Sequence, residues 1–128
     1  MQSRVCPGII NAGNTCFFSA IIQMLTNTNV PFFVAEYLKR HPNDVLNLLN
    51  TIFQHLLSGQ DVKKSLVIEI FSYFPNYDVS QQSDAHEFLI YLLSILGLNN
   101  NSMFSFSLNN YYLCSHCNFI SGWIKYLL

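Results

Sequence analysis

Apolar and polar residues follow one another with the period of an α-helix along most of the chain. In residues 16–25, apolar side chains recur at i, i+3, i+4 and i+7, which places one stripe of a predicted helix against a core. This stripe consists of Phe17, Ala20, Ile21 and Met24. Residues 1–15 are predicted to form a loop, and residues 27–31 are predicted to end the helix.

Four further helices are predicted from the same period, over residues 33–40, 44–57, 62–74 and 83–96. Each is followed by a residue type that ends helices: Pro42, Gly59, Pro75 and Gly97. The helices over 44–57 and 83–96 each keep a continuous apolar face, which predicts their core positions. These positions are Val45, Leu48, Leu49, Ile52, Phe53, Leu56, Ala85, Phe88, Leu89, Leu92, Leu93 and Leu96.

The pattern changes near the end of the chain. Phe104, Phe106 and Leu108 alternate with polar residues, and this period of two predicts a strand over residues 103–113. The sequence therefore predicts a mainly α chain with a terminal β segment. No repeat or long linker divides it, and 128 residues suit one domain or part of one.

Composition limits the classes of function. Only 10% of the residues are charged and 51% are apolar, against about 25% charged in typical domains, so Asn, Ser and Gln cover the surface or a partner does. A net charge of −1 without a basic stripe argues against nucleic acid. The longest apolar run, residues 88–98, is shorter than the roughly 18 residues of a membrane span.

The cysteines bear on the cellular compartment. Polar residues 11–15 interrupt any signal-peptide core, so we expect an intracellular protein, in the cytoplasm or the nucleus. In that compartment, the four cysteines are expected to be thiols or metal ligands rather than disulfides.

Cys16 stands where the first helical pattern begins. The N–H groups and partial positive charge of a helix N-terminus favour the thiolate form of a cysteine. Gly13 allows a tight turn before it, and the amide of Asn11 can fold back to donate a hydrogen bond to an oxyanion. This combination fits a thiol hydrolase. The alternative is a buried structural cysteine, the commoner role of a lone cysteine.

The segment around Cys16 resembles the cysteine box of the ubiquitin-specific proteases. Residues 8–17 read GIINAGNTCF, close to the family pattern G-(L/I)-x-N-x-G-N-T-C-(F/Y), and Gln23 matches its trailing glutamine. The resemblance implies that Cys16 attacks the carbonyl at the C-terminal glycine of ubiquitin and that Asn11 helps to hold the oxyanion. It also implies the helical thumb subdomain of a papain-like thumb–palm–fingers fold. Ser19 and Ala20 depart from the family's usual Asn-Ser.

Residues 82–89, QSDAHEFL, resemble the second box of the same family, Q-x-D-A-(H/Q)-E-F-L. The resemblance implies that this helix packs beside the nucleophile helix and that Gln82, Asp84 and Glu87 bind the ubiquitin tail. For Asp84 and Glu87 a helix cap is an equal alternative, because the helix dipole favours acidic residues in a first turn. His86 is interpreted as structural, since the family's base comes from much further downstream.

The run Cys114-Ser115-His116-Cys117 stands where the family has the first half of its fingers zinc site. Cys114 and Cys117 supply two of the four ligands of a tetrahedral zinc, and His116 would be a strained third. We expect no required cofactor, and a structural zinc only where a second ligand pair comes from elsewhere. The resemblance thus assigns residues 8–25 to the cysteine box, 82–89 to the second box and 103–128 to the start of the fingers, within a partial catalytic domain over 1–128.

The family's catalytic base is a histidine in a later G-H-Y-like box, and His41, His55, His86 and His116 stand in no such context. A thiol hydrolase needs a base for the sulfur and an acid for the leaving amine. We therefore predict a cysteine-dependent deubiquitinase, cut before its catalytic histidine, that acts on ubiquitin or ubiquitinated proteins. Two alternatives stay open: an inactive remnant that at most binds ubiquitin or another protein, and a redox or zinc module built on Cys114 and Cys117.

Overall fold

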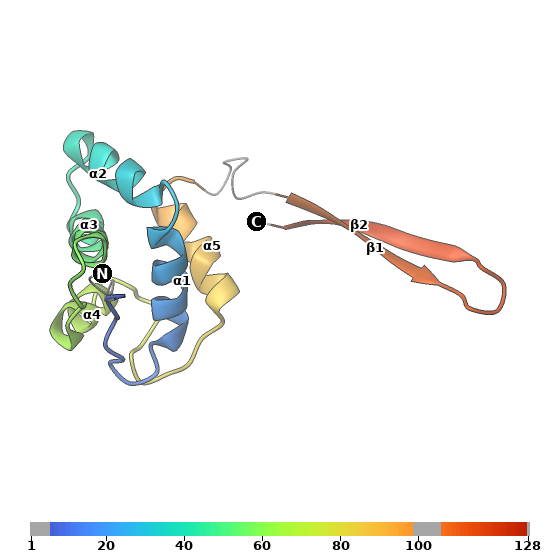
Figure 1. Ribbon diagram of the computed structural model, residues 1–128, viewed down its shortest axis with the longest axis horizontal. Helices are drawn as coiled ribbons and strands as arrows, with labels where there is room; N and C mark the ends of the chain where they lie inside the picture. The colour runs from blue at the N-terminus through green and yellow to red at the C-terminus, as the bar shows by residue number, and fades with distance from the viewer. Residues whose placement is uncertain (1–5, 99–105, 128) are drawn as a thin grey trace, which may run out of the picture. The chain divides into compact units, whose positions relative to one another are not determined.

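The computed structural model describes residues 6–98 and 106–127. Within these ranges the chain is mainly helical and ends in an antiparallel pair of strands (Figure 1). The chain divides into two compact units, one up to Leu89 and one from Ile90. The elements are α1 (Cys16–Thr26), α2 (Val30–Arg40), α3 (Asp44–Leu57), α4 (Lys64–Phe71), α5 (Ala85–Ile95), β1 (Phe106–Leu113) and β2 (Ile120–Leu127).

The helix over 44–57 is confirmed with both of its predicted ends. The Oδ1 of Asn43 accepts the N–H groups of Val45 and Leu46, which caps the first turn of α3. At the other end, Gly59 has φ +80°, a backbone conformation that glycine adopts without strain. Its N–H and that of the next residue bond back to α3 in a Schellman arrangement, and Gly97 ends α5 in the same way.

Helices α2, α4 and α5 have boundaries that differ from the prediction. Helix α2 begins at Val30, so Pro31 lies in its first turn, where the missing N–H costs nothing and the fixed φ suits a helix. Helix α4 starts only at Lys64, because Val62 instead forms a parallel bridge with Ile9. It ends at Phe71, before the predicted end at residue 74. Helix α5 begins at Ala85, two residues later than predicted.

The buried face of α1 is rotated from the predicted stripe. Ala20 and Met24 are exposed, and 47% of Met24 is accessible. The residues at 18, 21, 22 and 25 satisfy the same i, i+3, i+4, i+7 spacing, and packing against α2 and α3 accompanies their burial. The buried positions of α1 are Phe17, Phe18, Ile21, Ile22 and Leu25.

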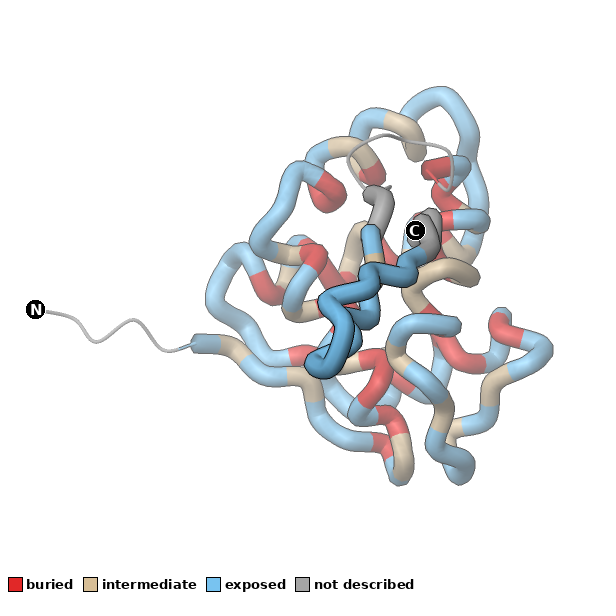
Figure 2. The backbone as a smooth tube through the Cα atoms, turned by 90° about the vertical axis from the view of Figure 1, so that its right-hand side faces the viewer, coloured by how far each residue is buried: buried red, intermediate tan, exposed pale blue. Residues whose placement is uncertain are grey.

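The cores of α3 and α5 are close to the predicted sets. In α3, Leu46 is buried although it was not predicted, whereas Val45 and Leu48 are only half-buried. In α5, Phe88, Leu92, Leu93 and Leu96 are buried, whereas Ala85 and Leu89 are half-buried. Buried positions recur along the helices, and the connecting segments are mostly exposed (Figure 2).

A cluster of aromatic rings joins the start of α1 to the start of α5. Phe88 is fully buried, and its ring centroid lies 5.4 Å from Phe17 and 5.7 Å from Phe18, both edge-on. Such edge-to-face pairs add about 0.5–1.5 kcal/mol each beyond the area they bury. The predicted packing of the second box beside the nucleophile helix is therefore confirmed at this point. The other members of the cluster are Phe71, Phe74 and Tyr77.

Residues 8–10, which precede α1, form hydrogen bonds with residues 61 and 62, which follow α3. The N–H of Ile10 donates to the carbonyl of Val62 at 3.1 Å, and the N–H of Val62 donates to the carbonyl of Gly8 at 2.9 Å. The carboxylate of Asp61 accepts the N–H of Gly8 at 2.7 Å. Part of the predicted loop is thus an extended, paired segment. Its first five residues lie outside the described ranges.

In the second unit, β1 and β2 form an antiparallel hairpin from the pair Phe106–Leu127 to the pair Leu113–Ile120. The predicted strand is confirmed from residue 106, and its residues 103–105 lie outside the described ranges. Strand β2 was not predicted from the sequence. Asn118, with φ +57°, turns the connecting loop, and its N–H donates to the carbonyl of Cys114.

No single helix of residues 6–98 has both the length and the apolar composition needed to span a membrane. Helices α1 and α2 meet the length and composition test only when they are counted together, across a bend of 91° between them.

Candidate functional site

Cys16 is the first residue of α1, and its side chain is an exposed free thiol. Thr15 occupies the N-cap position, but its side chain makes no capping bond to the helix. Within the described residues, the N–H groups of Cys16, Phe17 and Phe18 therefore have no hydrogen-bond acceptor. The thiol thus stands at a helix end whose donors remain available to a substrate. The alternative of a buried cysteine is wrong.

The side chain of Asn11 organises the loop before Cys16. Its Oδ1 accepts the N–H of Gly13 at 3.0 Å, the N–H of Thr15 at 3.2 Å and the hydroxyl of Thr15 at 3.0 Å. Because two of these donors are backbone N–H groups, the oxygen of the amide must face the loop. The Nδ2 donor then points elsewhere, and it makes no hydrogen bond within the described residues.

Thr15 is the buried polar residue at the centre of this loop. None of it is accessible, and its Oγ1 accepts the N–H of Ala12 at 3.0 Å while donating to Asn11. Its carbonyl accepts both the N–H and the hydroxyl of Ser19 from the first turn of α1. A buried hydroxyl that is fully bonded fixes the backbone around it. The residue directly before Cys16 is therefore held on both sides.

The loop also rests on the segment before α5. Asn14 donates its backbone N–H to the carbonyl of Val79 at 2.7 Å and its side-chain Nδ2 to the carbonyl of Ser80 at 2.7 Å. Gly13 has φ +136°, and a Cβ at this position would lie 2.6 Å from the oxygen of Val79. The predicted turn at Gly13 is thus confirmed, and this close approach is a second reason for a glycine there.

Asp78 closes the turn that carries these two carbonyls. Its Oδ1 accepts the N–H of Ser80 at 2.8 Å and the hydroxyl of Ser80 at 2.7 Å. These bonds hold the pKa of the Asp78 carboxyl below its ordinary value of 3.8. Residues 78–80 were not predicted as part of the site, because their contacts to the loop use backbone carbonyls, which every residue type possesses.

The three predicted substrate-binding residues lie at the start of α5. Asp84 precedes the helix, and its Oδ1 accepts the N–H of His86 at 2.8 Å, which is an N-cap bond. Glu87 lies in the first turn and is exposed, as is Gln82. The ring contact between Phe17 and Phe88 brings this helix start beside the start of α1. The helix-capping interpretation of Asp84 is therefore confirmed, and its contact with substrate stays a prediction.

Comparison with known proteins identifies the family. The family model described as ubiquitin carboxyl-terminal hydrolase matches residues 7–122. The chain belongs to this family. Curated relatives include ubiquitin carboxyl-terminal hydrolase 22-B of Xenopus laevis, 36% identical over 98 residues, and hydrolase 27 of Homo sapiens, 36% identical over 101 residues. Each alignment covers 70% of this chain, and 19% and 22% of the respective relative.

A more distant relative is hydrolase 14 of Caenorhabditis elegans, 31% identical over 99 residues, with 68% of this chain and 20% of the relative covered. The chain thus spans about a fifth of the length of the curated relatives it matches. Within the ubiquitin-specific protease family, the chain corresponds to the N-terminal part of the catalytic domain.

The two cysteines that the sequence predicts as half of a zinc site lie in the hairpin loop between β1 and β2. Cys114 and Cys117 are both exposed thiols. Backbone N–H groups of Cys117 and His116 and the side chain of Cys117 donate to the Cys114 sulfur, which lowers the pKa of that thiol from 9.0. The described residues contain no group of three or more His, Cys, Asp or Glu side chains that could hold a metal ion. The two thiols alone therefore do not complete a tetrahedral site.

The described histidines of this family member differ in their surroundings. His41 stacks on Tyr37 with ring centroids 4.4 Å apart, and His116 lies in the hairpin loop. The Nδ1 of His55 is buried on α3 without a hydrogen-bond partner in the described residues. His86 is exposed in the first turn of α5, and its interpretation as a structural residue stays a prediction.

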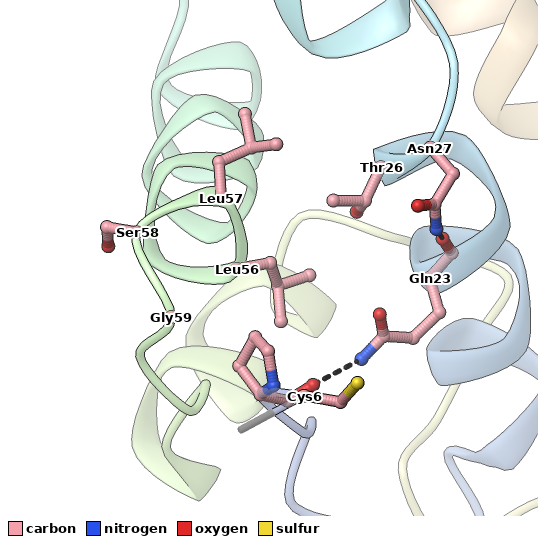
Figure 3. Close-up of a pocket in the computed structure, with 9 residues that line it drawn as sticks. Cys6, Gln23, Thr26, Asn27, Leu56, Leu57, Ser58 and Gly59 are labelled. Carbon is pink, nitrogen blue, oxygen red and sulfur yellow. Dashed lines mark hydrogen bonds between the residues drawn. The ribbon is translucent and has the colours of Figure 1, made fainter. Parts of the chain in front are cut away.

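A pocket of about 560 Å³ lies beside the last turn of α1 (Figure 3). Cys16 is at the other end of this helix. The pocket is formed by the last turns of α1 and α3 and by the segment at Cys6 and Pro7. Gln23, which matches the trailing glutamine of the cysteine box, donates its Nε2 to the carbonyl of Pro7 at 3.0 Å. Gln23 therefore anchors the N-terminal segment to α1.

Proposed function

We propose that this chain carries the nucleophile of a cysteine-dependent deubiquitinase, which cleaves the thioester or isopeptide bond at the C-terminus of ubiquitin. The observation that carries the proposal is the exposed thiol of Cys16 at an uncapped helix N-terminus, at the end of a loop held by the side chains of Asn11 and Thr15. In the reaction, the Cys16 sulfur bonds to the carbonyl carbon of the terminal glycine and the amine or thiol leaves. Water then hydrolyses the thioester and restores the thiol.

The geometry of Asn11 supports a role as an oxyanion donor. Its Oδ1 is occupied by the loop, which fixes the orientation of the amide before any substrate arrives. The Nδ2 is then a preorganised donor, and the N–H groups at the start of α1 are further donors at the same helix end. Donors that need no reorganisation stabilise a developing oxyanion most effectively.

The start of α5 is the proposed contact for the ubiquitin tail. Gln82, Asp84 and Glu87 are exposed there. Only Oδ1 of Asp84 is used by the N-cap, which leaves its second oxygen to accept a hydrogen bond from substrate. In this proposal the helical unit, which consists of helices α1–α5 and the segments that connect them, corresponds to the thumb subdomain of a papain-like fold. The hairpin of β1 and β2 corresponds to the start of the fingers.

One observation favours a second candidate, a ubiquitin-binding module without turnover. Within the described residues, Cys16 is an exposed free thiol, and no hydrogen bond joins its sulfur to an imidazole. Deprotonation of the sulfur and protonation of the leaving amine need such a group. In this alternative the chain binds the ubiquitin tail and reacts with an electrophile, but it does not hydrolyse an amide.

The test uses ubiquitin that carries an electrophile at its C-terminus. We expect the protein to form one covalent adduct, which Cys16→Ala abolishes and Cys6→Ala leaves intact, because Cys6 is also an exposed free thiol. An adduct that survives in Cys16→Ala contradicts the assignment of the nucleophile. Turnover of a fluorogenic ubiquitin amide by the same protein then favours the hydrolase, and an adduct without turnover favours the binding module.

A further inference from the structure

Residues 78–81 form a tight turn beside the cysteine loop. The N–H of Gln81 donates to the carbonyl of Asp78 at 3.1 Å, which closes a four-residue turn. In such a turn, the carbonyls of the two central residues have no acceptor role inside the turn itself. These are the carbonyls of Val79 and Ser80, and Asn14 donates to both of them at 2.7 Å.

The carboxylate of Asp78 sets the conformation of this turn. It accepts the N–H and the hydroxyl of Ser80, so three hydrogen bonds close the turn when that of Gln81 is included. Asp78 is exposed and belongs to no core contact. Its bonds therefore act on the direction of the two carbonyls rather than on the packing of the helices.

The cysteine loop has little freedom to adapt if these carbonyls move. The backbone of Gly13 already approaches the oxygen of Val79 so closely that no side chain fits between them. From Asn14, one buried residue, Thr15, connects to Cys16. A change in the direction of the carbonyls is thus transmitted to the nucleophile over two residues.

We propose that Asp78 is a positioning residue for Cys16, because it presents the carbonyls of Val79 and Ser80 to Asn14 and so holds the loop from which the nucleophile reacts. The proposal rests on the proposed function, in which Cys16 attacks the ubiquitin C-terminus. Asp78 itself does not touch the substrate. Its effect is on the rate of the covalent step and not on the binding of ubiquitin.

The test measures saturation kinetics of covalent capture of the electrophilic ubiquitin, which separates the affinity for the probe from the maximal rate constant. We expect Asp78→Ala to lower that rate constant by about tenfold with the affinity within about twofold, since small misplacements of reacting groups are costly. Asp78→Asn keeps an oxygen acceptor for Ser80 and is expected to restore the rate. Asn14→Asp, which removes the Nδ2 donor, is expected to reproduce the loss.

The matched control is Asp44→Ala, which removes an exposed carboxylate at the start of α3, away from the loop. We expect its rate constant to equal that of the unaltered protein. Circular dichroism melts establish that every variant is folded. An unchanged rate constant in both Asp78→Ala and Asn14→Asp overturns the proposal, and so does an equal loss in Asp44→Ala or a failure of Asp78→Asn to restore the rate.

Failure of the proposed function is recognised separately, because the unaltered protein then captures no ubiquitin probe. In that case, alkylation by iodoacetamide provides the measurement, with Cys6 as the internal standard in the same molecule. We expect the ratio of alkylation at Cys16 to that at Cys6 to change by at least about threefold in Asp78→Ala and not in Asp78→Asn. An unchanged ratio overturns the positioning role.

Discussion

The side-chain amide of Asn14 donates to the carbonyl of Ser80 at 2.7 Å, across 66 positions of sequence. This bond joins the loop that ends at Cys16 to the turn that precedes the second box. The ring of Phe17, next to Cys16, meets the ring of Phe88 from the second box at 5.4 Å. The two sequence motifs therefore belong to one structural unit, with polar contacts between their loops and aromatic contacts beneath them.

Gly13→Ala is expected to destabilise the protein by about 2–3 kcal/mol, because the new Cβ meets the carbonyl oxygen of Val79 and the positive φ disfavours a side chain. The free energy of unfolding in urea provides the measurement. Gly59→Ala is the control, since φ there is also positive but nothing lies within 4 Å of the added Cβ. It is expected to cost about 1–2 kcal/mol. Equal losses in the two variants contradict the close approach at Gly13.

Asn11→Ala and Asn11→Asp separate the two roles of this side chain. Alanine removes the acceptor of three hydrogen bonds and leaves the buried Thr15 underbonded, which is expected to cost about 1–3 kcal/mol of stability. Aspartate keeps an acceptor for these donors but has no Nδ2 donor. We expect near-normal stability with slower covalent capture of ubiquitin, measured by thermal melts and adduct formation. A normal rate of capture in Asn11→Asp contradicts the oxyanion role.

Phe88→Ala is expected to destabilise the helical unit by about 3–5 kcal/mol, because the ring is fully buried within the aromatic cluster. Chemical denaturation checks this value. Phe32→Ala removes the same side chain from a position that is 71% exposed on α2, and its effect is expected to stay within about 0.5 kcal/mol. A small effect of Phe88→Ala means that the cluster does not hold α1 and α5 together.

The turn at Asp78 is expected to respond to acid. Its pKa is lower in the folded chain than its ordinary value of 3.8, because Ser80 donates two hydrogen bonds to it. The ionised group therefore stabilises the fold above the unfolded pKa, and this contribution is lost as the pH falls through the folded pKa. The amide chemical shift of Ser80 in an NMR titration should show a midpoint below 3.8, absent in Asp78→Asn. A midpoint at or above that value contradicts the bonded carboxylate.

Local sequence signals accounted for much of the helical unit. The ends of α3 follow from the Asn43 cap and from Gly59, which act within one turn of the helix and need no distant partner. The place of Cys16 at a helix start followed from the apolar period that begins there, whereas its exposure was found only in the structure. The predicted start of α2 was wrong, because a proline such as Pro31 can follow the end of one helix or lie in the first turn of the next.

What the sequence by itself determined are the features set by local conformational preference: the helices, their glycine ends, the first strand and the place of Cys16. Tertiary structure decided between alternatives that local sequence preference does not distinguish. Two apolar stripes of α1 have the same spacing, and packing against α2 and α3 selects the one that contains Phe18 and Leu25. The cysteine loop is held by hydrogen bonds to the carbonyls of Val79 and Ser80. Every residue has a backbone carbonyl, so only the folded backbone shows which carbonyls hold the loop.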